Sequence, residues 1–317
     1  MTAMTSKVSV IIPCYNAARY VGETLESLRR QTWRNLEVIV VDDGSTDDSA
    51  RIVEAFEGLD ITLLRQPNRG QTVALNAGLA RASGDFVQYL DADDLIDSDK
   101  IAVQLARLEG QSGAVASARW GRFYGRPDET RFETETVSRD LGSLDWLVES
   151  RAEGLGMMFP ALWLVPMSIV RAAGPWREDL NLNNDAEYFT RVLLAADRVL
   201  FCEDARCRYR SGISGSLSGS KKPAHWASQA KVIELCEQRV LARDAGERAR
   251  RGFSLSWQHL AHACYPYDPS LAERALTHAR ALHPEIIRPQ GGAAFMILSR
   301  LLGWRTARRL QVVGGRP

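Results

Sequence analysis

Hydrophobic residues in the first third of the chain alternate between two periodicities. Four short runs rich in β-branched residues, 8–12, 36–41, 61–64 and 86–90, are typical of buried parallel strands. Between them, hydrophobic residues recur every three or four positions over 18–30, 47–56 and 72–82, which indicates amphipathic helices. Strands separated by helices of this length form βαβ units. The pattern therefore predicts an α/β fold with a mostly parallel sheet flanked by helices.

The pattern is less regular in the rest of the chain. Aromatic and charged residues mix over 115–137, which predicts extended segments or a hairpin. A helix is expected at 185–196, where Asn183 or Asn184 can cap its first turn. Several further helices are predicted within 224–282. The carboxyl-terminal third is therefore expected to be mainly helical.

The composition is that of an ordinary globular protein. It gives no indication of a nucleic-acid partner or of a membrane-spanning segment. The 317 residues carry a formal net charge of +1 and no basic stripe dominates the first 280, so we expect no nucleic-acid partner. Five cysteines without framework spacing are expected to be reduced thiols. The amino terminus lacks the features of a secretory signal, and no stretch reaches the roughly 18 apolar residues of a spanning helix. We therefore expect a cytoplasmic protein.

Two groups of acidic residues follow predicted strands. Asp42 and Asp43 end the second strand, and Asp91, Asp93 and Asp94 follow the fourth. In an open α/β sheet, ligands bind outside the carboxyl ends of the strands, so both groups are expected to face one crevice. Carboxylate oxygens there suit Mg²⁺ or Mn²⁺ and the diphosphate that such an ion carries. The sequence therefore predicts chemistry on a nucleotide-diphosphate substrate.

The loop at 13–16 follows the first strand and is expected at the same edge as Asp43. A carboxylate there can accept the imide N–H of uracil or thymine, or the N–H groups of guanine, and Asp43 is our candidate for that contact. Arg69 precedes a helix whose amino terminus would face the same crevice, where the side chain can contact base or phosphate. The alternatives are an Asp-Gly turn beside a helix cap for Asp43 and an ordinary surface position for Arg69.

Asp91 and Asp93 form a D-x-D pattern. Carboxylates spaced in this way at a strand end can converge on one cation, which would neutralise a departing diphosphate. The alternative is a solvated acidic turn, or Asp94 capping the next helix. The preceding strand and the first acidic group favour the cation site.

Two segments together resemble a known enzyme family. They are VSVIIPCYNAARYVGETLESLRRQTWRNLEVIVVDDGSTDDS and NRGQTVALNAGLARASGDFVQYLDADD, and they resemble the family 2 glycosyltransferases with the GT-A fold. The resemblance implies transfer of a sugar from a nucleotide diphosphate to a hydroxyl acceptor, with inversion at the anomeric carbon and with Mn²⁺ or Mg²⁺. It implies that Asp43 binds the base, that Asp91 lies near the ribose or metal, and that Asp93 is the direct metal ligand. The other expected donor-binding residues are Pro13, Tyr15, Asn16 and Arg69.

The resemblance is close over residues 6–105 and weaker to about residue 210. It implies a nucleotide-sugar-binding half at 1–115 and an acceptor-binding half of the same GT-A domain at 116–215. Residues 216–317 are expected to form a mainly helical carboxyl-terminal extension.

An inverting transfer needs a general base, because a hydroxyl group is a poor nucleophile until its proton is removed. The family places this base at the start of a helix, and in GPWREDLNLNNDAEYFTRV the matching residue is Asp185. Asn184 stands where many relatives carry an acid, and Glu187 is the second candidate. The helix amino terminus is expected to lower the pKa of Asp185. The alternative is an acid that only complements the helix dipole.

The acceptor is expected to be a saccharide or a lipid-linked molecule. Trp163 or Trp176 could stack on a sugar or belong to the core, and the Gly/Ser-rich stretch 211–220 could close over the diphosphate or act as a linker. Residues 293–313 are apolar and arginine-rich, which fits either peripheral membrane contact or a basic helix packed on the domain.

Two other classes of protein are alternatives to a glycosyltransferase. A nucleotidyltransferase would need a Gly-rich basic loop after the first strand, and residues 13–19 contain no glycine. A non-catalytic sugar-nucleotide-binding protein, or a scaffold subunit of a polysaccharide assembly complex, remains the alternative. No Q-x-x-R-W segment is present, so we expect non-processive transfer, in cell-surface polysaccharide or glycolipid biosynthesis by analogy with the family.

Overall fold

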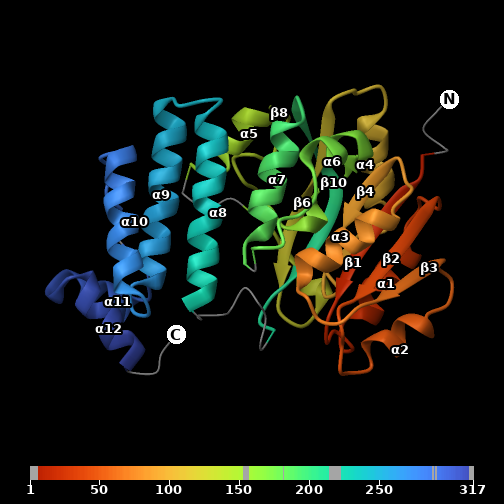
Figure 1. Ribbon diagram of the computed structural model, residues 1–317, viewed down its shortest axis with the longest axis horizontal. Helices are drawn as coiled ribbons and strands as arrows, with labels where there is room; N and C mark the ends of the chain where they lie inside the picture. Colours follow the sequence, from red (N-terminus) through yellow and green to blue (C-terminus); the bar gives the residue numbers. More distant parts are fainter. Residues whose placement is uncertain are drawn as a thin grey trace. The chain divides into compact units, whose positions relative to one another are not determined.

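The computed structural model describes residues 6–152, 157–180, 182–213, 223–287, 289 and 291–313. The chain divides into two compact units (Figure 1). One consists of Met1–Trp146 and Met158–Gly215, and the other of Leu147–Met157 and Ser216–Pro317.

The first unit contains a sheet of five strands in the order β3-β2-β1-β4-β9. Its first four strands are parallel, and the short β9 pairs antiparallel with β4. The strands are β1 (Val8–Cys14), β2 (Leu36–Asp42), β3 (Ile61–Arg65), β4 (Phe86–Tyr89) and β9 (Val165–Pro166). Cys14, Asp42 and Arg65 are neighbours in register, so three strands end level with one another. The predicted mostly parallel sheet is confirmed.

Helices connect these strands in the predicted alternation. They are α1 (Val21–Arg29), α2 (Ser49–Glu54) and α3 (Gln71–Arg81). Helix α3 packs on β1 and β2, and Ala74 joins Ile39 and Val41 in a buried cluster. Gly78 allows this close approach, because an added Cβ would lie 2.5 Å from a methyl group of Ile11.

A second sheet in the same unit has the strand order β5-β10-β6-β7, with β8 also paired to β10. Its strands are β5 (Leu95–Ile96), β6 (Ala114–Phe123), β7 (Arg131–Phe132), β8 (Leu141–Gly142) and β10 (Arg198–Arg210). β6 and β7 form the expected antiparallel hairpin. Helices of this part are α4 (Lys100–Leu108), α5 (Ser143–Glu149), α6 (Met167–Ala173) and α7 (Asn184–Leu194). Because β4 belongs to the first sheet and β5 to the second, the D-x-D loop links the two sheets.

Aromatic side chains fill the core beside α7. The Trp176 ring stacks on Tyr188 with centroids 3.9 Å apart, and Trp163 stacks on Phe189 at 5.4 Å. Both tryptophans are at most 2% exposed. The suggestion that either ring stacks on a sugar is therefore wrong, because other aromatic rings of the core already cover them.

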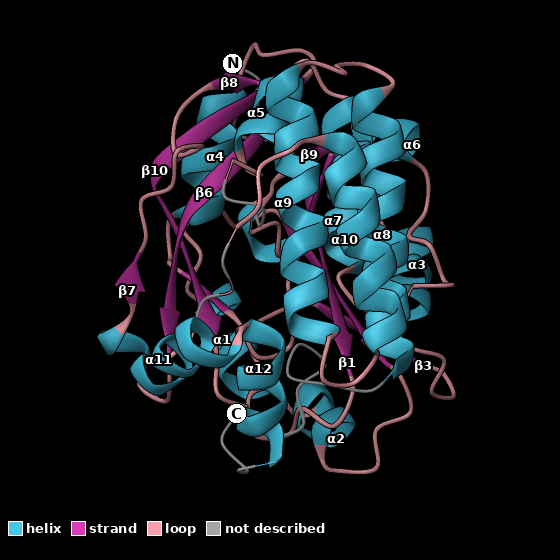
Figure 2. Cartoon of the chain, turned by 90° about the vertical axis from the view of Figure 1, so that its left-hand side faces the viewer, coloured by secondary structure: helices cyan, strands magenta, loops and turns pink. Residues whose placement is uncertain are grey.

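The second unit is helical, as expected for the carboxyl-terminal third. Its helices are α8 (Pro223–Leu241), α9 (Glu247–Cys264), α10 (Pro269–Leu282), α11 (Ala293–Leu302) and α12 (Trp304–Val313). α8, α9 and α10 pack in sequence, and α11 packs on α12 (Figure 2). Buried Glu237 accepts one hydrogen bond from Trp257 and contacts His278, which joins all three long helices. Among the described residues, no helix has the length and apolarity needed to cross a membrane. All five cysteines of the chain are buried free thiols.

Candidate active site

The loops that follow β1 and β2 are joined by hydrogen bonds at the carboxyl end of the sheet. The Asn16 amide N–H donates to Ser45 Oγ at 3.0 Å, and the Thr46 N–H donates to Asn16 Oδ1 at 2.8 Å. Asn16 makes these contacts with a φ of 49°, in the left-handed region that asparagine tolerates. Pro13 is buried within β1, whereas the Tyr15 side chain is 52% exposed. The structure therefore brings Tyr15 and Asn16 to the edge where Asp42 and Asp43 lie.

Asp43 accepts hydrogen bonds from the loop between β3 and α3 and thereby holds it in place. Its Oδ1 accepts hydrogen bonds from Gln66 Nε2 at 2.7 Å and the Arg69 N–H at 2.9 Å, and its Oδ2 accepts from the Gly70 N–H at 2.8 Å. Gly70 has a φ of 95°, which favours glycine, and it precedes the first residue of α3. The Arg69 side chain is exposed. Asp43 thus positions the amino terminus of α3, and its contact with a base stays a prediction.

The D-x-D loop is held mainly through its backbone. Thr24 Oγ1 on α1 donates to the carbonyl groups of Ala92 and Asp94, both at 2.9 Å. From the end of β10, Arg210 Nε donates to the Asp93 carbonyl at 2.8 Å, and the Arg210 N–H donates to Asp94 Oδ1 at 2.9 Å. Asp94 is buried and helix α4 begins only at Lys100, so Asp94 does not cap it. These contacts fix the loop while leaving the Asp91 and Asp93 side chains partly exposed.

Burial and like charge raise the pKa values of these acids. Burial, together with the nearby charges of Asp93 and Asp185, raises the pKa of Asp91 to about 8, against the opposing effect of a hydrogen bond from Gln71. Burial also raises the pKa of Asp93, although the Arg210 charge opposes that shift. A cation would relieve the repulsion between these carboxylates. The residues present therefore fit a divalent ion.

The number of protein ligands limits how such an ion could be held. Within the described part of the chain, no three His, Cys, Asp or Glu side chains are placed to hold a metal by themselves. Mg²⁺ commonly takes one or two carboxylates together with substrate phosphates and water. The geometry thus suits an ion that arrives with, or is completed by, a diphosphate.

Asp185 lies in the first turn of α7, and Asn183 is the N-cap residue. Its Oδ1 accepts a hydrogen bond from the Ala186 N–H at 2.8 Å. Burial nevertheless raises the pKa of Asp185 to about 6, so the expected lowering by the helix amino terminus is wrong. Burial outweighs the backbone hydrogen bonds here. A carboxyl group with a pKa near 6 is still ionised at neutral pH and is a stronger base than an exposed aspartate.

A glutamine that the sequence analysis missed connects the two acidic regions. Gln71 Nε2 donates to Asp91 Oδ1 at 2.9 Å, and Asn184 Nδ2 donates to Gln71 Oε1 at 3.3 Å. Gln71 is the first residue of α3, directly after Gly70. Its position at the start of a helix that faces the sheet edge was the feature of the sequence that could have identified Gln71. Asn184, where the family pattern led us to expect an acid, here completes the Gln71 bridge.

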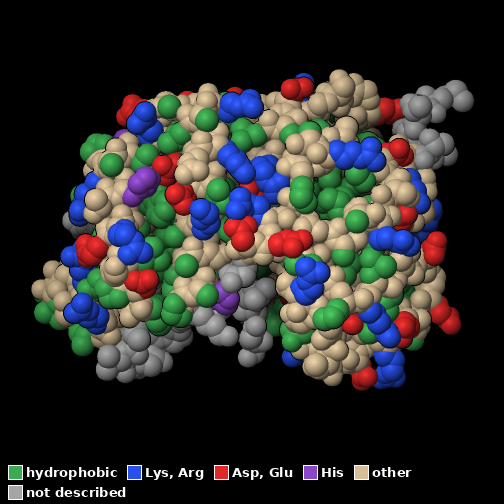
Figure 3. Space-filling view, in the orientation of Figure 1, with side chains coloured by type: hydrophobic (Ala, Val, Ile, Leu, Met, Phe, Trp, Pro, Cys, Tyr) green, Lys and Arg blue, Asp and Glu red, His purple; other side chains and the backbone are tan. Residues whose placement is uncertain are grey.

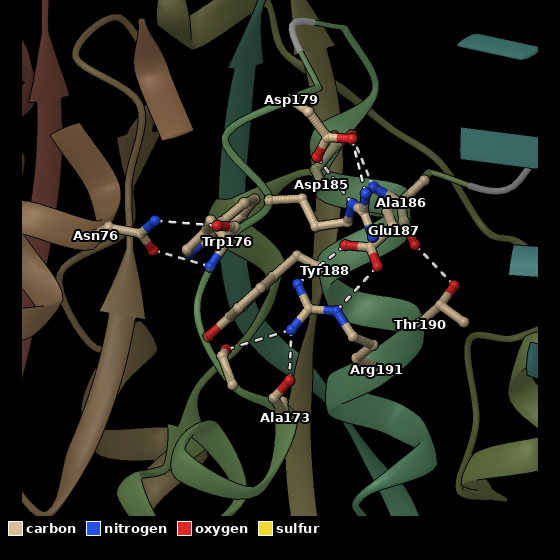
Figure 4. A network of polar contacts seen from close by, with 12 residues as sticks. Asn76, Ala173, Trp176, Asp179, Asp185, Ala186, Glu187, Tyr188, Thr190 and Arg191 are labelled. Carbon is tan, nitrogen blue, oxygen red and sulfur yellow. Dashed lines mark hydrogen bonds and ion pairs between the residues drawn. The ribbon is translucent and has the colours of Figure 1, made fainter. Parts of the chain in front are cut away.

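Glu187 has a structural role in the same helix. Its side chain is 1% exposed and pairs with Arg191 at 3.0 and 2.9 Å (Figure 4). Arg191 also donates to the carbonyl groups of Ala173 and Gly174. The carboxylate of Glu187 is therefore engaged by a guanidinium, and Asp185 is the better candidate for the base.

Asn76 on α3 holds the segment that leads into α7. Its Nδ2 donates to the Trp176 carbonyl at 2.9 Å, and its Oδ1 accepts from the Trp176 N–H at 2.8 Å (Figure 4). This two-way contact spans 100 positions of sequence. The contact gives Asn76 a structural role that the hydrophobic pattern of α3 does not predict.

Two segments that bear on the predictions are described only in part. In the Gly/Ser-rich stretch 211–220, predicted either to close over the diphosphate or to act as a linker, only residues 211–213 are described. In the segment 154–170, which contains Trp163, residues 157–170 are described, and Phe159, Leu162 and Trp163 are core side chains.

Comparisons with known proteins agree with this geometry. A family model for glycosyl transferase family 2 matches residues 9–168, about half of the chain. The glycosyltransferase GlyG of Streptococcus pneumoniae serotype 4 is 27% identical over 256 residues, which span 75% of this chain and 80% of that protein. With some other relatives the match spans only 17% of their length.

Solved structures share the fold at low identity. TarS residues 1–349 from S. aureus, in complex with UDP-GlcNAc, superpose with a TM-score of 0.70 at 19% identity, covering 98% of this chain and 92% of that one. The mannosyltransferase PcManGT from Pyrobaculum calidifontis, in complex with GDP-Man and Mn²⁺, gives a TM-score of 0.56 at 20% identity, covering 98% and 88%. At this identity the likeness concerns the fold.

Proposed function

The chain belongs to glycosyl transferase family 2 and has the GT-A fold, and we propose that its strand-end site moves a sugar from a nucleotide-diphosphate donor to a hydroxyl acceptor with inversion. One observation carries the proposal. Gln71 bridges the two acidic regions, because its Nε2 donates to Asp91 Oδ1 at 2.9 Å and its Oε1 accepts from Asn184, the neighbour of Asp185, at 3.3 Å. This bridge supports a single reaction site that contains both the proposed base and the donor-side acids.

The donor is proposed to lie along the loops at the ends of β1, β2 and β4. Asp43 accepts an N–H of the base, Pro13, Tyr15 and Asn16 line the nucleotide, and Arg69 contacts base or phosphate. The nucleotide sugars bound by the two structural neighbours, UDP-GlcNAc and GDP-Man, support this class of donor.

Mn²⁺ or Mg²⁺ is proposed as the cofactor. Asp93, with Asp91 beside it, would hold the ion together with diphosphate oxygens. When bound, the ion neutralises the charge of the leaving diphosphate. The partly buried carboxylate of Asp91, which the charge of Asp93 repels, supports this assignment, as does the Mn²⁺ in the mannosyltransferase neighbour.

Asp185 is proposed to take the proton of the acceptor hydroxyl as its oxygen attacks the anomeric carbon from the face opposite the diphosphate. Its pKa of about 6 keeps it ionised at neutral pH. Holding donor and acceptor in line in this site would supply much of the acceleration. The acceptor is proposed to be a saccharide or a lipid-linked molecule, extended by one or a few sugars at the cytoplasmic side in cell-surface polysaccharide or glycolipid biosynthesis.

A binding experiment tests the donor site. Calorimetry with UDP, GDP and dTDP, each with and without Mn²⁺, is expected to give metal-dependent binding of one nucleotide. Asp93→Ala is expected to abolish that dependence, whereas Asp60→Ala, at an exposed acid before β3, leaves it unchanged. If no nucleotide binds with metal, the donor assignment is wrong, and a non-catalytic scaffold becomes the better description.

A further inference from the structure

The exposed leucines of the described chain gather on its last two helices. Leu301 and Leu302 on α11 are 75% and 52% exposed, and Leu310 on α12 is 47% exposed. Ile297 on α11 is 59% exposed. We call these four residues, together with Arg300, Arg305 and Arg309, the terminal surface. Isolated exposed leucines are common, and hydrophobic side chains are scattered over the face drawn in Figure 3, but a cluster of this kind marks an interaction site.

The two helices pack on each other, and α12 contacts Tyr265 and His262 of the second unit, so their exposed residues do not result from undocked helices. Phe295 on α11 is 4% exposed and packs under the Arg308 guanidinium, 4.5 Å from its ring centroid. Ala307 on α12 is 1% exposed. Trp304 at the start of α12 lies edge-on to His262 and Tyr265 of the second unit, with centroids 4.8 and 5.0 Å apart.

On α11 the exposed residues follow helical spacing. Ile297 and Leu301 are four positions apart and therefore share one face, and Arg300 adjoins it. On α12, Arg305 and Arg309 are also four positions apart. Apolar and basic side chains thus alternate over a short distance.

The charge of this segment has one sign. After Glu285 the sequence contains six arginines and no aspartate, glutamate or lysine. Arg305 pairs with Glu273 of α10 at 2.5 Å, and Arg309 is exposed but lies over the Tyr265 ring, 5.4 Å from its centroid. Arg300 is exposed as well. An apolar face flanked mainly by cations complements a layer of anionic headgroups above hydrocarbon.

We propose that the terminal surface docks on a membrane that carries anionic lipids. The side chains of Ile297, Leu301, Leu302 and Leu310 enter the boundary between headgroups and acyl chains, while Arg300 and Arg309 contact headgroup phosphates. The proposal rests on α11 and α12 alone and does not depend on the glycosyl-transfer chemistry.

Vesicle co-sedimentation of the full chain tests this docking. We expect binding to vesicles of phosphatidylcholine with phosphatidylglycerol, weaker binding to phosphatidylcholine alone, and a loss of affinity as salt rises. Ile297→Ser with Leu301→Ser should weaken binding at least tenfold, because each change removes most of the apolar area that one side chain can bury. Arg300→Gln with Arg309→Gln should weaken binding to the anionic vesicles about 30-fold at low salt.

Matched controls separate docking from general surface effects. Tyr124→Ser changes a 71% exposed aromatic residue of the first unit, and Arg81→Gln with Arg274→Gln removes two exposed charges from other helices. These variants should bind vesicles as the wild type does. All variants should keep the wild-type circular dichroism and nucleotide binding, and the arginine pair provides the test if the Ile297 and Leu301 variant does not fold.

Three results would overturn the proposal. The first is an absence of binding to anionic vesicles by a folded wild-type chain. The second is binding that neither double variant reduces. The third is a concentration-dependent self-association in sedimentation equilibrium that Ile297→Ser with Leu301→Ser abolishes, because the surface would then be covered by a second copy of the chain.

Discussion

The two acidic loops at the carboxyl end of the sheet carry the same kind of residue under opposite conditions. Asp43 after β2 is 3% exposed and accepts three hydrogen bonds from the loop between β3 and α3. Asp91 after β4 accepts one from Gln71 and is repelled by Asp93 and Asp185. One carboxylate organises the loop around it, and the other is held among like charges. An acid at a strand end can therefore either position a neighbouring loop or lie among like charges as a candidate ligand for a cation. Only the groups that surround the acid distinguish these two roles.

The largest expected effect concerns the base that completes the second group. Asp185→Asn keeps the hydrogen-bonding shape of the α7 amino terminus but removes the proton acceptor. A general base contributes about 10²–10⁴-fold, so transfer rates should fall by that amount while metal-dependent nucleotide binding survives. Measured transfer with the matching donor checks this.

The matched control for this change is Glu187→Gln, which alters the acid that pairs with Arg191 in the same helix. It should lower thermal stability more than it lowers the rate measured on folded protein. An Asp185→Asn enzyme with near wild-type turnover would remove Asp185 from the mechanism.

The contrast between the two loops can be tested directly through stability. Asp43→Asn places an amide N–H against the Gly70 N–H or leaves another buried donor without an acceptor, which costs about 2 kcal/mol of unfolding free energy. Asp91→Asn removes a buried, repelled charge and should leave the free energy of unfolding at pH 8 unchanged or higher. Urea unfolding of both variants without added metal measures the difference. Equal destabilisation by the two changes would show that the loops do not differ in this way.

Much of this arrangement could be predicted from the sequence, and the features that could not be predicted have a physical reason in common. The strand runs, the helical spacing and the acids at strand ends depend on local pattern, so the parallel sheet and the placement of Asp43 and Asp91 at its edge could be inferred. The raised pKa of Asp185 could not, because it results from burial by segments distant in sequence. The Gln71 bridge joins positions 20 and 113 residues away, and no periodicity encodes such a contact. The burial of Trp163 and Trp176 likewise depends on how α7 packs.

The raised pKa values also predict how stability varies with pH. Asp91 titrates near 8 and Asp185 near 6 in the folded chain, and both titrate near 4 when unfolded. A raised carboxyl pKa contributes stability that is present below pH 4 and is lost as pH rises through the folded value. From these two groups we expect the metal-free protein to lose about 5 kcal/mol between pH 5 and pH 8.

Two variants and one addition of ligand test this pH dependence. Asp91→Asn should flatten the profile of unfolding free energy, and Asp60→Asn, at an exposed acid, should leave it as in the wild type. Adding Mn²⁺ with a bound nucleotide should restore stability at pH 8. A wild-type profile that rises steadily from pH 5 to pH 8, and does so equally in Asp91→Asn, would contradict the electrostatic difference between the loops.

The smallest expected effect comes from Gln71, which bridges Asp91 and Asn184. Its amide donates to Asp91 and thereby opposes the rise in the pKa of that carboxyl. Gln71→Ala should therefore move the pH at which metal-dependent donor binding appears to higher values. It should also lower kcat/KM about tenfold, with most of the change in KM for the donor.

Gln71→Glu keeps the size of the side chain but adds a charge next to Asp91, so it should shift the pH profile further. Asn184→Ala removes only the other end of the bridge, so its effect should fall on kcat through the position of Asp185. A uniform loss of activity in all three variants, with an unchanged pH profile, would reduce Gln71 to a packing residue.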